Sequence, residues 1–162
     1  MLSLEKNLCG KHFDEYIEVC ASLADTFSLT KNGWEFECEE AERQRILALL
    51  APFYIRTMQT EHWFCQRVPV GYEKEVYLFN MTEESKQILL SEYRSVFYES
   101  SVWSKPEDLC FFKKNKLFSG SLTHEKICYV YDYETIFSEK VTLPNAWEML
   151  PSNLAEQIIL PE

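Results

Sequence analysis

The pair of residues best suited to acid–base chemistry in this chain is His124-Glu125. A histidine beside a carboxylate changes its charge near neutral pH and could act as a general base. The pair stands in the polar tetrapeptide 123–126, between two apolar runs, so we expect it at an exposed turn. Because no nucleophile stands at a readable spacing from it, a solvated turn is the simpler interpretation, and we assign no catalytic residue.

Two cysteine–histidine pairs raise the question of a metal site. Cys9 and His12 are spaced Cys-x-x-His, and His62 and Cys65 are spaced His-x-x-Cys. Together the two pairs could close a tetrahedral zinc site. Zinc modules usually show tighter, paired spacing, and Cys65 belongs to an aromatic run. We therefore expect no metal and no other cofactor, and the sequence leaves open whether the four side chains approach one another.

Cysteine could also supply a nucleophile, provided that a thiolate lies near a histidine in positive surroundings. Cys110 and Cys128 stand in neighbouring apolar runs that could end near His124. Both are flanked by large apolar residues, so we expect buried, unreactive thiols. The 6 cysteines include no Cys-x-x-Cys pair, and in a reducing compartment they are expected to be free.

The charge of the chain narrows the classes of partner. The formal net charge is −10, from 26 acidic and 16 basic residues spread along the sequence. A field of that sign repels phosphate backbones and anionic membranes, so we expect neither nucleic acid nor membrane as a partner. A basic protein would be attracted, although an acidic surface also simply keeps a protein soluble. Without a membrane-length apolar stretch or a signal pattern, the chain is expected to be cytoplasmic.

The elements that would position these residues form a single domain, 1–162. Its 162 residues are 46% apolar, which suits one domain of ordinary size. The stretch 106–133 holds three aromatic-rich runs separated by two short polar breaks, the pattern of consecutive antiparallel strands. Shorter runs at 34–38, 53–55, 62–65 and 75–79 also favour strands.

Three segments show helical patterns. Apolar residues recur every three or four positions over residues 11–29, which predicts a helix ended by a turn at 30–33. A second helix is predicted at 39–50 and a third at 83–93, the latter capped by Thr82. A short turn is expected to begin at Asn145 and to run through Leu150. The combination predicts an α+β fold, a mainly antiparallel sheet with about three helices packed on it.

Aromatic side chains are the remaining signal, at 15% of the residues. Tyr129, Tyr131 and Tyr133 share one face of a predicted strand, among carboxylates, and Trp103 is one of the other aromatic residues. Aromatic residues act as anchors in protein interfaces, so we predict a binding surface of Tyr129, Tyr131, Tyr133, His124, Glu125 and Trp103. The alternative is an inner face packed on a helix, with hydroxyl groups at its rim.

In size and composition the whole chain resembles the small, acidic immunity proteins of bacteria, which neutralise a cognate toxin. This resemblance identifies no individual positions. It implies a non-catalytic domain that binds a basic protein such as a toxin. Two alternatives are a phage-encoded inhibitor that mimics nucleic acid with rows of carboxylates, and a small enzyme that uses His124 with Glu125 or a cysteine. The sequence does not indicate the oligomeric state.

Overall fold

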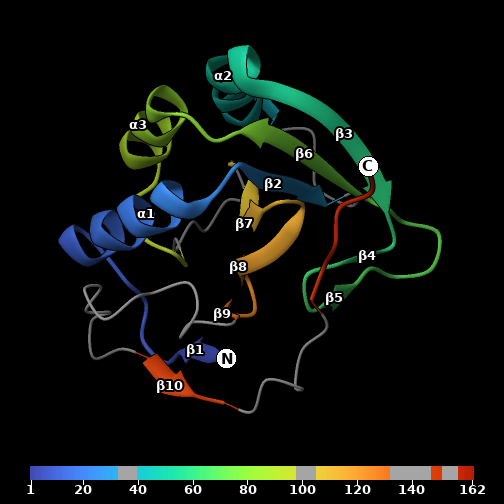
Figure 1. Cartoon of the computed structure of the whole chain (residues 1–162). Coiled ribbons are helices and arrows are strands. Elements are labelled where there is room, and N and C mark those ends of the chain that lie inside the picture. The colour runs from blue at the N-terminus through green and yellow to red at the C-terminus, as the bar shows by residue number, and fades with distance from the viewer. Residues whose placement is uncertain (33–39, 98–104, 132–146, 151–156) are drawn as a thin grey trace.

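The computed structural model describes residues 1–32, 40–97, 105–131, 147–150 and 157–162. These residues form three α-helices, one eight-stranded sheet and a separate two-stranded hairpin (Figure 1). Every pair of neighbouring strands in the sheet is antiparallel. The predicted α+β fold, with a mainly antiparallel sheet and about three helices, is therefore confirmed. None of the described helices has the length and apolar character needed to cross a bilayer.

The order of strands across the sheet differs from their order along the chain. From one edge to the other the strands are β10 (Trp147–Met149), β1 (Leu2–Leu4), β9 (Ile127–Val130), β8 (Lys116–Leu122), β7 (Glu107–Lys113), β2 (Thr26–Asn32), β6 (Lys74–Asn80) and β3 (Tyr54–Thr60). The hairpin consists of β4 (His62–Trp63) and β5 (Gln66–Arg67). The three runs predicted within 106–133 are β7, β8 and β9, as expected from their pattern.

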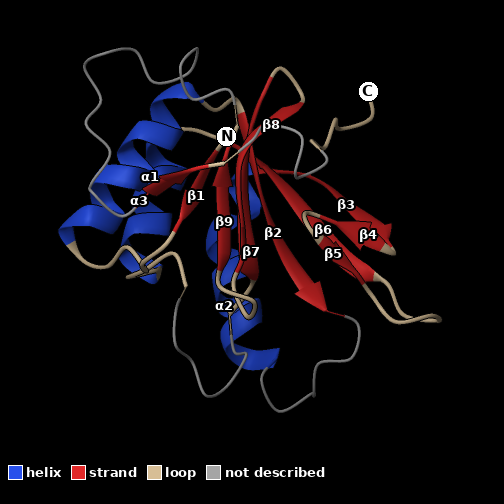
Figure 2. Ribbon diagram, turned by 90° about the horizontal axis from the view of Figure 1, so that it is seen from below, coloured by secondary structure: helices blue, strands red, loops and turns tan. Residues whose placement is uncertain are grey.

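The two faces of the sheet carry separate hydrophobic cores. The helices α1 (Lys11–Leu23), α2 (Glu40–Leu50) and α3 (Glu83–Glu92) lie together on one side, and the β4–β5 hairpin lies on the other (Figure 2). Phe27, Phe79 and Phe111 belong to the core beneath the helices. Trp63 and Phe64 bring the hairpin into the opposite core. Because both faces are covered, most central strand residues are buried.

The first helix is shorter than the sequence predicted. It ends at Leu23, and the backbone of Ala24 is already extended. Residues 26–32 form β2, so the predicted turn at 30–33 was wrong for residues 30–32. Phe27 fits the apolar spacing of the helix, but Phe27 and Leu29 also alternate as a strand does, and both are fully buried beside β6 and β7.

The other two helices agree with the prediction. Helix α2 extends over Glu40–Leu50, with the predicted first residue, Glu39, outside the described residues, and has carboxylates in its first turn. Thr82 caps α3 as expected: its Oγ1 accepts the Ser85 N–H at 3.2 Å, and the Ser85 Oγ accepts the Thr82 N–H at 2.9 Å.

The two ends of the chain form strands that the sequence did not reveal. Residues 2–4 form β1, which pairs with β10. Because residues 147–149 are extended in β10, the predicted turn through Leu150 was wrong over these positions. The strand predicted at 34–38 lies outside the described residues.

Candidate functional site

The predicted turn at His124 lies beside two buried carboxyl groups at the start of β7. Ligand atoms of Glu107, Asp108 and His124 all lie within 4.8 Å of one another. Glu107 and Asp108 are 3% and 1% exposed, whereas His124 is exposed, as expected for a turn residue. The turn itself is closed by a hydrogen bond from the Lys126 N–H to the Thr123 carbonyl at 3.2 Å.

Asp108 is held at a local irregularity of the sheet. Its φ of 55° lies in the left-handed region, which aspartate tolerates better than most residues. The pairing of β2 with β7 shifts register between Ser28 and Thr30, opposite this position, as in a β-bulge. The Asp108 Oδ1 accepts the Thr123 N–H at 2.8 Å, and the Asp108 N–H donates to the Thr123 Oγ1 at 3.3 Å. The bulge thus points Asp108 at the turn that carries His124.

A buried ion pair joins Asp108 to Lys74 at the start of β6. Each of the two side chains is 1% exposed, and the Lys74 ammonium contacts the Asp108 Oδ2 directly. The Thr30 Oγ1 donates a further hydrogen bond to the same oxygen at 3.1 Å. Removal of two charges from water is costly unless they are paired and hydrogen-bonded, which both are here. Lys74 thus supplies the counter-charge of Asp108.

His124 connects the β8–β9 turn to the hairpin on the same face of the sheet. Its Nε2 lies 3.2 Å from the Nε2 of Gln66 in β5 and 3.8 Å from the Oε1 of Glu125. The partners of His124 are therefore an amide and an exposed carboxylate. Two roles agree with this arrangement. His124 can hold the hairpin in place through Gln66, or it can act as a general base.

A small cavity adjoins the buried carboxyl groups on the helix side. It is lined by aromatic side chains from α1 and from the segment after α3, and by Glu107, Asp108 and Thr123. The free space holds about one water molecule, far less than a small-molecule ligand needs. Asp108 therefore lies at both the ion pair and the cavity.

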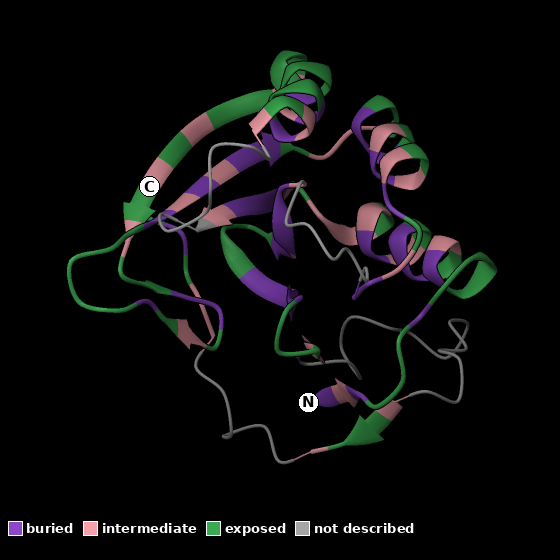
Figure 3. Cartoon of the chain, turned by 180° about the vertical axis from the view of Figure 1, so that it is seen from behind, coloured by how far each residue is buried: buried purple, intermediate pink, exposed green. Residues whose placement is uncertain are grey.

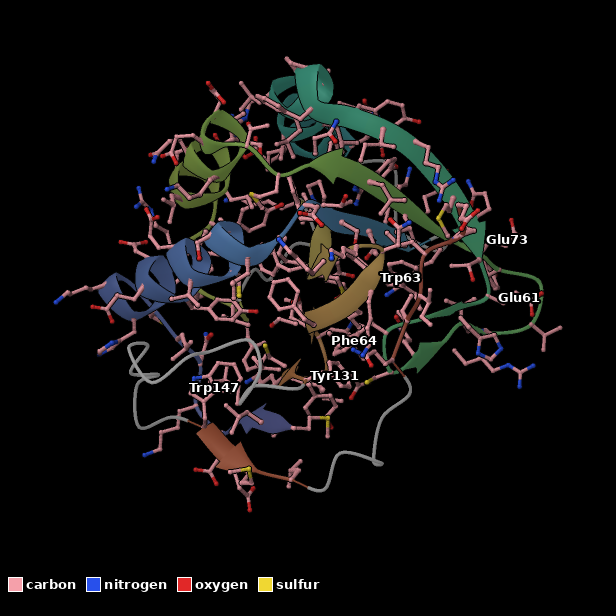
Figure 4. The ribbon with its side chains drawn as sticks, viewed as in Figure 1. Glu61, Trp63, Phe64, Glu73, Tyr131 and Trp147 are labelled. Carbon is pink, nitrogen blue, oxygen red and sulfur yellow. The ribbon has the colours of Figure 1, made fainter. Side chains whose placement is uncertain are left out.

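The tyrosines of β9 and its continuation are largely internal. Tyr131 is 4% exposed and belongs to the core under the hairpin, near Phe64 (Figure 4). Tyr129 is half-buried, and its ring meets that of Phe64 edge-on at a centroid distance of 6.0 Å. Burial raises the pKa of both phenol groups. Tyr131 is thus a core residue and not an exposed anchor; it packs against the hairpin, not against a helix. Tyr133 and Trp103 lie outside the described residues.

The four possible zinc ligands do not gather. Cys9 and His12 lie at the start of α1, whereas His62 and Cys65 belong to the hairpin on the opposite face of the sheet (Figure 2). Within the described ranges, the one group of three or more ligating side chains close enough to share an ion is the cluster around Asp108, which contains none of the four.

The cysteines of the strands are buried thiols, as predicted. Cys110 and Cys128 are fully buried. Burial raises the pKa of Cys128 to about 12 and raises that of Cys110 further. Cys65 is exposed at the tip of the hairpin, yet partial burial of its sulfur raises its pKa to about 11. These three thiols are protonated near pH 7 and are poor nucleophiles in that form.

The net charge of −10 is distributed unevenly along the chain. The described residues hold 18 acidic and 15 basic side chains, whereas the rest of the sequence holds 8 acidic and 1 basic. Most of the excess negative charge therefore belongs to the segments between the described elements. Several cations of the described part pair with helix carboxylates: Arg45 with Glu42 and Glu92, and Lys86 with Glu18 and Glu83.

The buried cluster was not among the residues singled out from the sequence. Lys74 precedes the adjacent residues Glu107 and Asp108 by more than 30 positions, and His124 follows them by at least 16. No sequence motif relates these residues. One signal was present: Lys74 alternates in phase with Val76 and Leu78, so its side chain had to lie on a buried face. Comparison with known proteins finds no family model, no curated protein and no solved structure that matches this chain.

Proposed function

We propose that this chain acts by binding a basic protein, and that its role is that of an immunity-type protein which neutralises a basic toxin. The observation that carries the proposal is the uneven distribution of charge. The described fold is close to charge balance, with 18 acidic and 15 basic residues, while the other segments are strongly acidic. A negative potential attracts a basic partner and speeds the encounter.

The hydrogen bonds that Asp108 makes within the chain support a binding role. Both carboxylate oxygens of Asp108 are engaged, Oδ2 by Lys74 and Thr30 and Oδ1 by the Thr123 N–H. A base that abstracts protons from a substrate needs a free oxygen or nitrogen within reach of it. The hydrogen bonds of Asp108 hold the end of the sheet in shape, and a rigid surface binds with less loss of entropy than a mobile one.

Two carboxylates of the acidic segment 33–39 offer a direct test of the electrostatic part, because the excess of negative charge lies outside the described fold. The variant Glu35→Lys/Glu37→Lys is compared with Glu61→Lys/Glu73→Lys, which makes the same change of charge at two exposed residues of the described fold, both at one corner of the sheet (Figure 4). The probe is the product of the gene next to that of this chain, expressed under an inducible promoter in a bacterial host.

The expected result is that the neighbouring product stops growth and that co-expression of this chain restores it. In a binding assay with the purified pair, the association rate should fall as salt is raised. The Glu35→Lys/Glu37→Lys variant should associate more slowly than its control. A harmless neighbour, or a toxic one that this chain neither binds nor neutralises, would refute the proposal. Competition by duplex DNA for the same partner would instead favour a mimic of nucleic acid.

A second candidate function is acid–base catalysis at His124. It is favoured by one observation, the approach of Glu107 and Asp108 to His124 beside a cavity. Broad substrate screens of the intact chain would test it, with His124→Ala set against Lys126→Ala in the same turn. Turnover that is lost only in His124→Ala would establish an enzyme, and absence of turnover would remove this candidate.

A further inference from the structure

The β4–β5 hairpin docks on the main sheet through side chains. Its two strands form a sheet of their own, so no ladder of backbone hydrogen bonds joins them to the other strands. The bond at its base, from the Val68 N–H to the Glu61 carbonyl at 2.9 Å, also stays within the hairpin. Beyond its neighbours in sequence, the hairpin makes one hydrogen-bonding contact within the described part of the chain, that of Gln66 with His124 at 3.2 Å.

The surface by which the hairpin docks is apolar. Trp63 and Phe64 are buried in the core that also contains Cys110. A Cβ added to Gly120 would lie 2.8 Å from the Phe64 ring and 3.0 Å from the Cys110 Sγ, so the Cys110 thiol lies beside the Phe64 ring. Residues 69–73, which return the chain to β6, are all exposed (Figure 3). The hairpin therefore covers Cys110 but is connected to β6 by a segment without buried residues.

Docking of the hairpin leaves polar atoms without partners. The Nε1 of Trp63, the Oε1 of Gln66 and the Oη of Tyr131 are buried and make no hydrogen bond with the described residues. Such atoms lose the hydrogen bonds that water would give them, which is a cost to the docked state. A region with few hydrogen bonds to the rest of a fold also opens more readily than the whole fold unfolds. Both arguments indicate that undocking of the hairpin requires less free energy than unfolding of the main sheet.

We propose that the β4–β5 hairpin is a flap, which undocks as a unit and uncovers Tyr129, Tyr131 and Cys110 on the sheet. The ring of Tyr129 meets that of Phe64 at a centroid distance of 6.0 Å, so departure of Phe64 exposes it further. The aromatic face that the sequence predicted for binding is thus present on β9 but closed in the docked state. The core beneath the helices, which contains Cys128, stays covered when the hairpin undocks. The inference does not depend on the proposed toxin partner.

Labelling of the native thiols tests the flap within one molecule. Methyl methanethiosulfonate is added to the folded chain, in a Cys65→Ser background that removes the exposed thiol of the hairpin itself, and mass spectrometry follows each cysteine peptide. Relative to its rate in the unfolded chain, Cys110 should react about tenfold faster or more than Cys20 and Cys128, the buried thiols on the helix side. Low concentrations of urea should change the Cys110 rate little, because undocking exposes little surface, and should raise the other two rates steeply. Equal relative rates with equal urea dependence would overturn the inference.

Two variants test the direction of the effect, with the Cys128 rate as the measure of global unfolding. Tyr131→Phe removes an unpaired hydroxyl from the docked state, so it should slow the labelling of Cys110 about tenfold. Phe64→Leu removes buried atoms from the hairpin, so it should speed that labelling about tenfold. The matched control is Tyr129→Phe, which loses a hydroxyl from a half-buried ring and should change the rate about twofold or less. Faster labelling in Tyr131→Phe, or a Cys110 rate that neither variant changes, would contradict the flap.

Discussion

The buried pair of Lys74 and Asp108 should make a large and specific contribution to stability. Asp108→Asn keeps the size of the side chain and its tolerance of the left-handed backbone, but leaves the Lys74 ammonium buried without a counter-charge. Loss of one partner from a buried ion pair costs about 3–5 kcal/mol. A domain is stable by only about 5–15 kcal/mol, so the variant should lose a large share of its free energy of unfolding. Urea denaturation followed by tryptophan fluorescence at pH 7 measures this loss.

Two further variants separate the ion pair from mere disturbance of the core. The double variant Lys74→Met/Asp108→Asn removes both charges, and it should recover most of the stability lost in Asp108→Asn. Lys113→Met is the matched control, because Lys113 pairs with Asp25 at 3.3 Å with both side chains about half exposed. A surface pair of that kind contributes about 1 kcal/mol or less. If Asp108→Asn cost no more than Lys113→Met, or if the double variant were no better than the single one, the reasoning would be refuted.

Three other predictions test the packing, the pH dependence and the reactivity of the fold. In Gly120→Ala the new Cβ would lie 2.8 Å from the Phe64 ring, so we expect a loss of about 1–3 kcal/mol in urea denaturation that is smaller when Phe64→Leu is also present. The Lys114 N–H, which donates to Asp25 at 2.8 Å, holds the pKa of Asp25 below its usual range, so the stabilisation is present above the unfolded pKa and disappears as the pH falls through the folded pKa. Urea midpoints between pH 6 and pH 2 should accordingly fall less in Asp25→Asn than in the parent chain; equal slopes would contradict this. The pKa of about 11 for Cys65 leaves about 200-fold less thiolate at pH 8 than in an unhindered thiol with a pKa of about 8.5, so iodoacetamide should modify it more slowly, as measured on its peptide by mass spectrometry. Equal rates would show that its sulfur is not desolvated.

Local signals in the sequence were sufficient for much of the fold. The Thr82 cap of α3 and the carboxylates in the first turns of α2 and α3 act within one turn of the chain, so both helices were predicted close to their observed positions. The three strands after Pro106 were recognised because each turn between them is short and polar. The hairpin turn at Lys114 and Asn115, with φ of 48° and 64°, even has the backbone expected of a two-residue connection.

The errors arose where contacts distant in sequence decide between two local options. Phe27 satisfies both helical and strand spacing, and only the neighbouring strands β6 and β7 make the strand the better choice. The burial of Tyr131 depends on the hairpin that brings Phe64 over it. Lys74 and Asp108 are 34 residues apart, and the left-handed backbone that directs Asp108 toward its partners has no marker in the sequence.

The buried cluster joins the ends of four strands through one carboxylate. The ion pair of Lys74 with Asp108 joins β6 to β7. Thr30 of β2 donates a hydrogen bond to the same carboxylate, and so does the N–H of Thr123 in the turn after β8. These strands end together, and residues 33–39, with three glutamates and no basic residue, follow directly from β2. Because four strand ends are held by one carboxylate, the end of β2 from which this acidic sequence continues is held in place. Under the proposed function, a basic partner attracted to these carboxylates would meet a rigid surface beside them, which costs less entropy on binding than a mobile one.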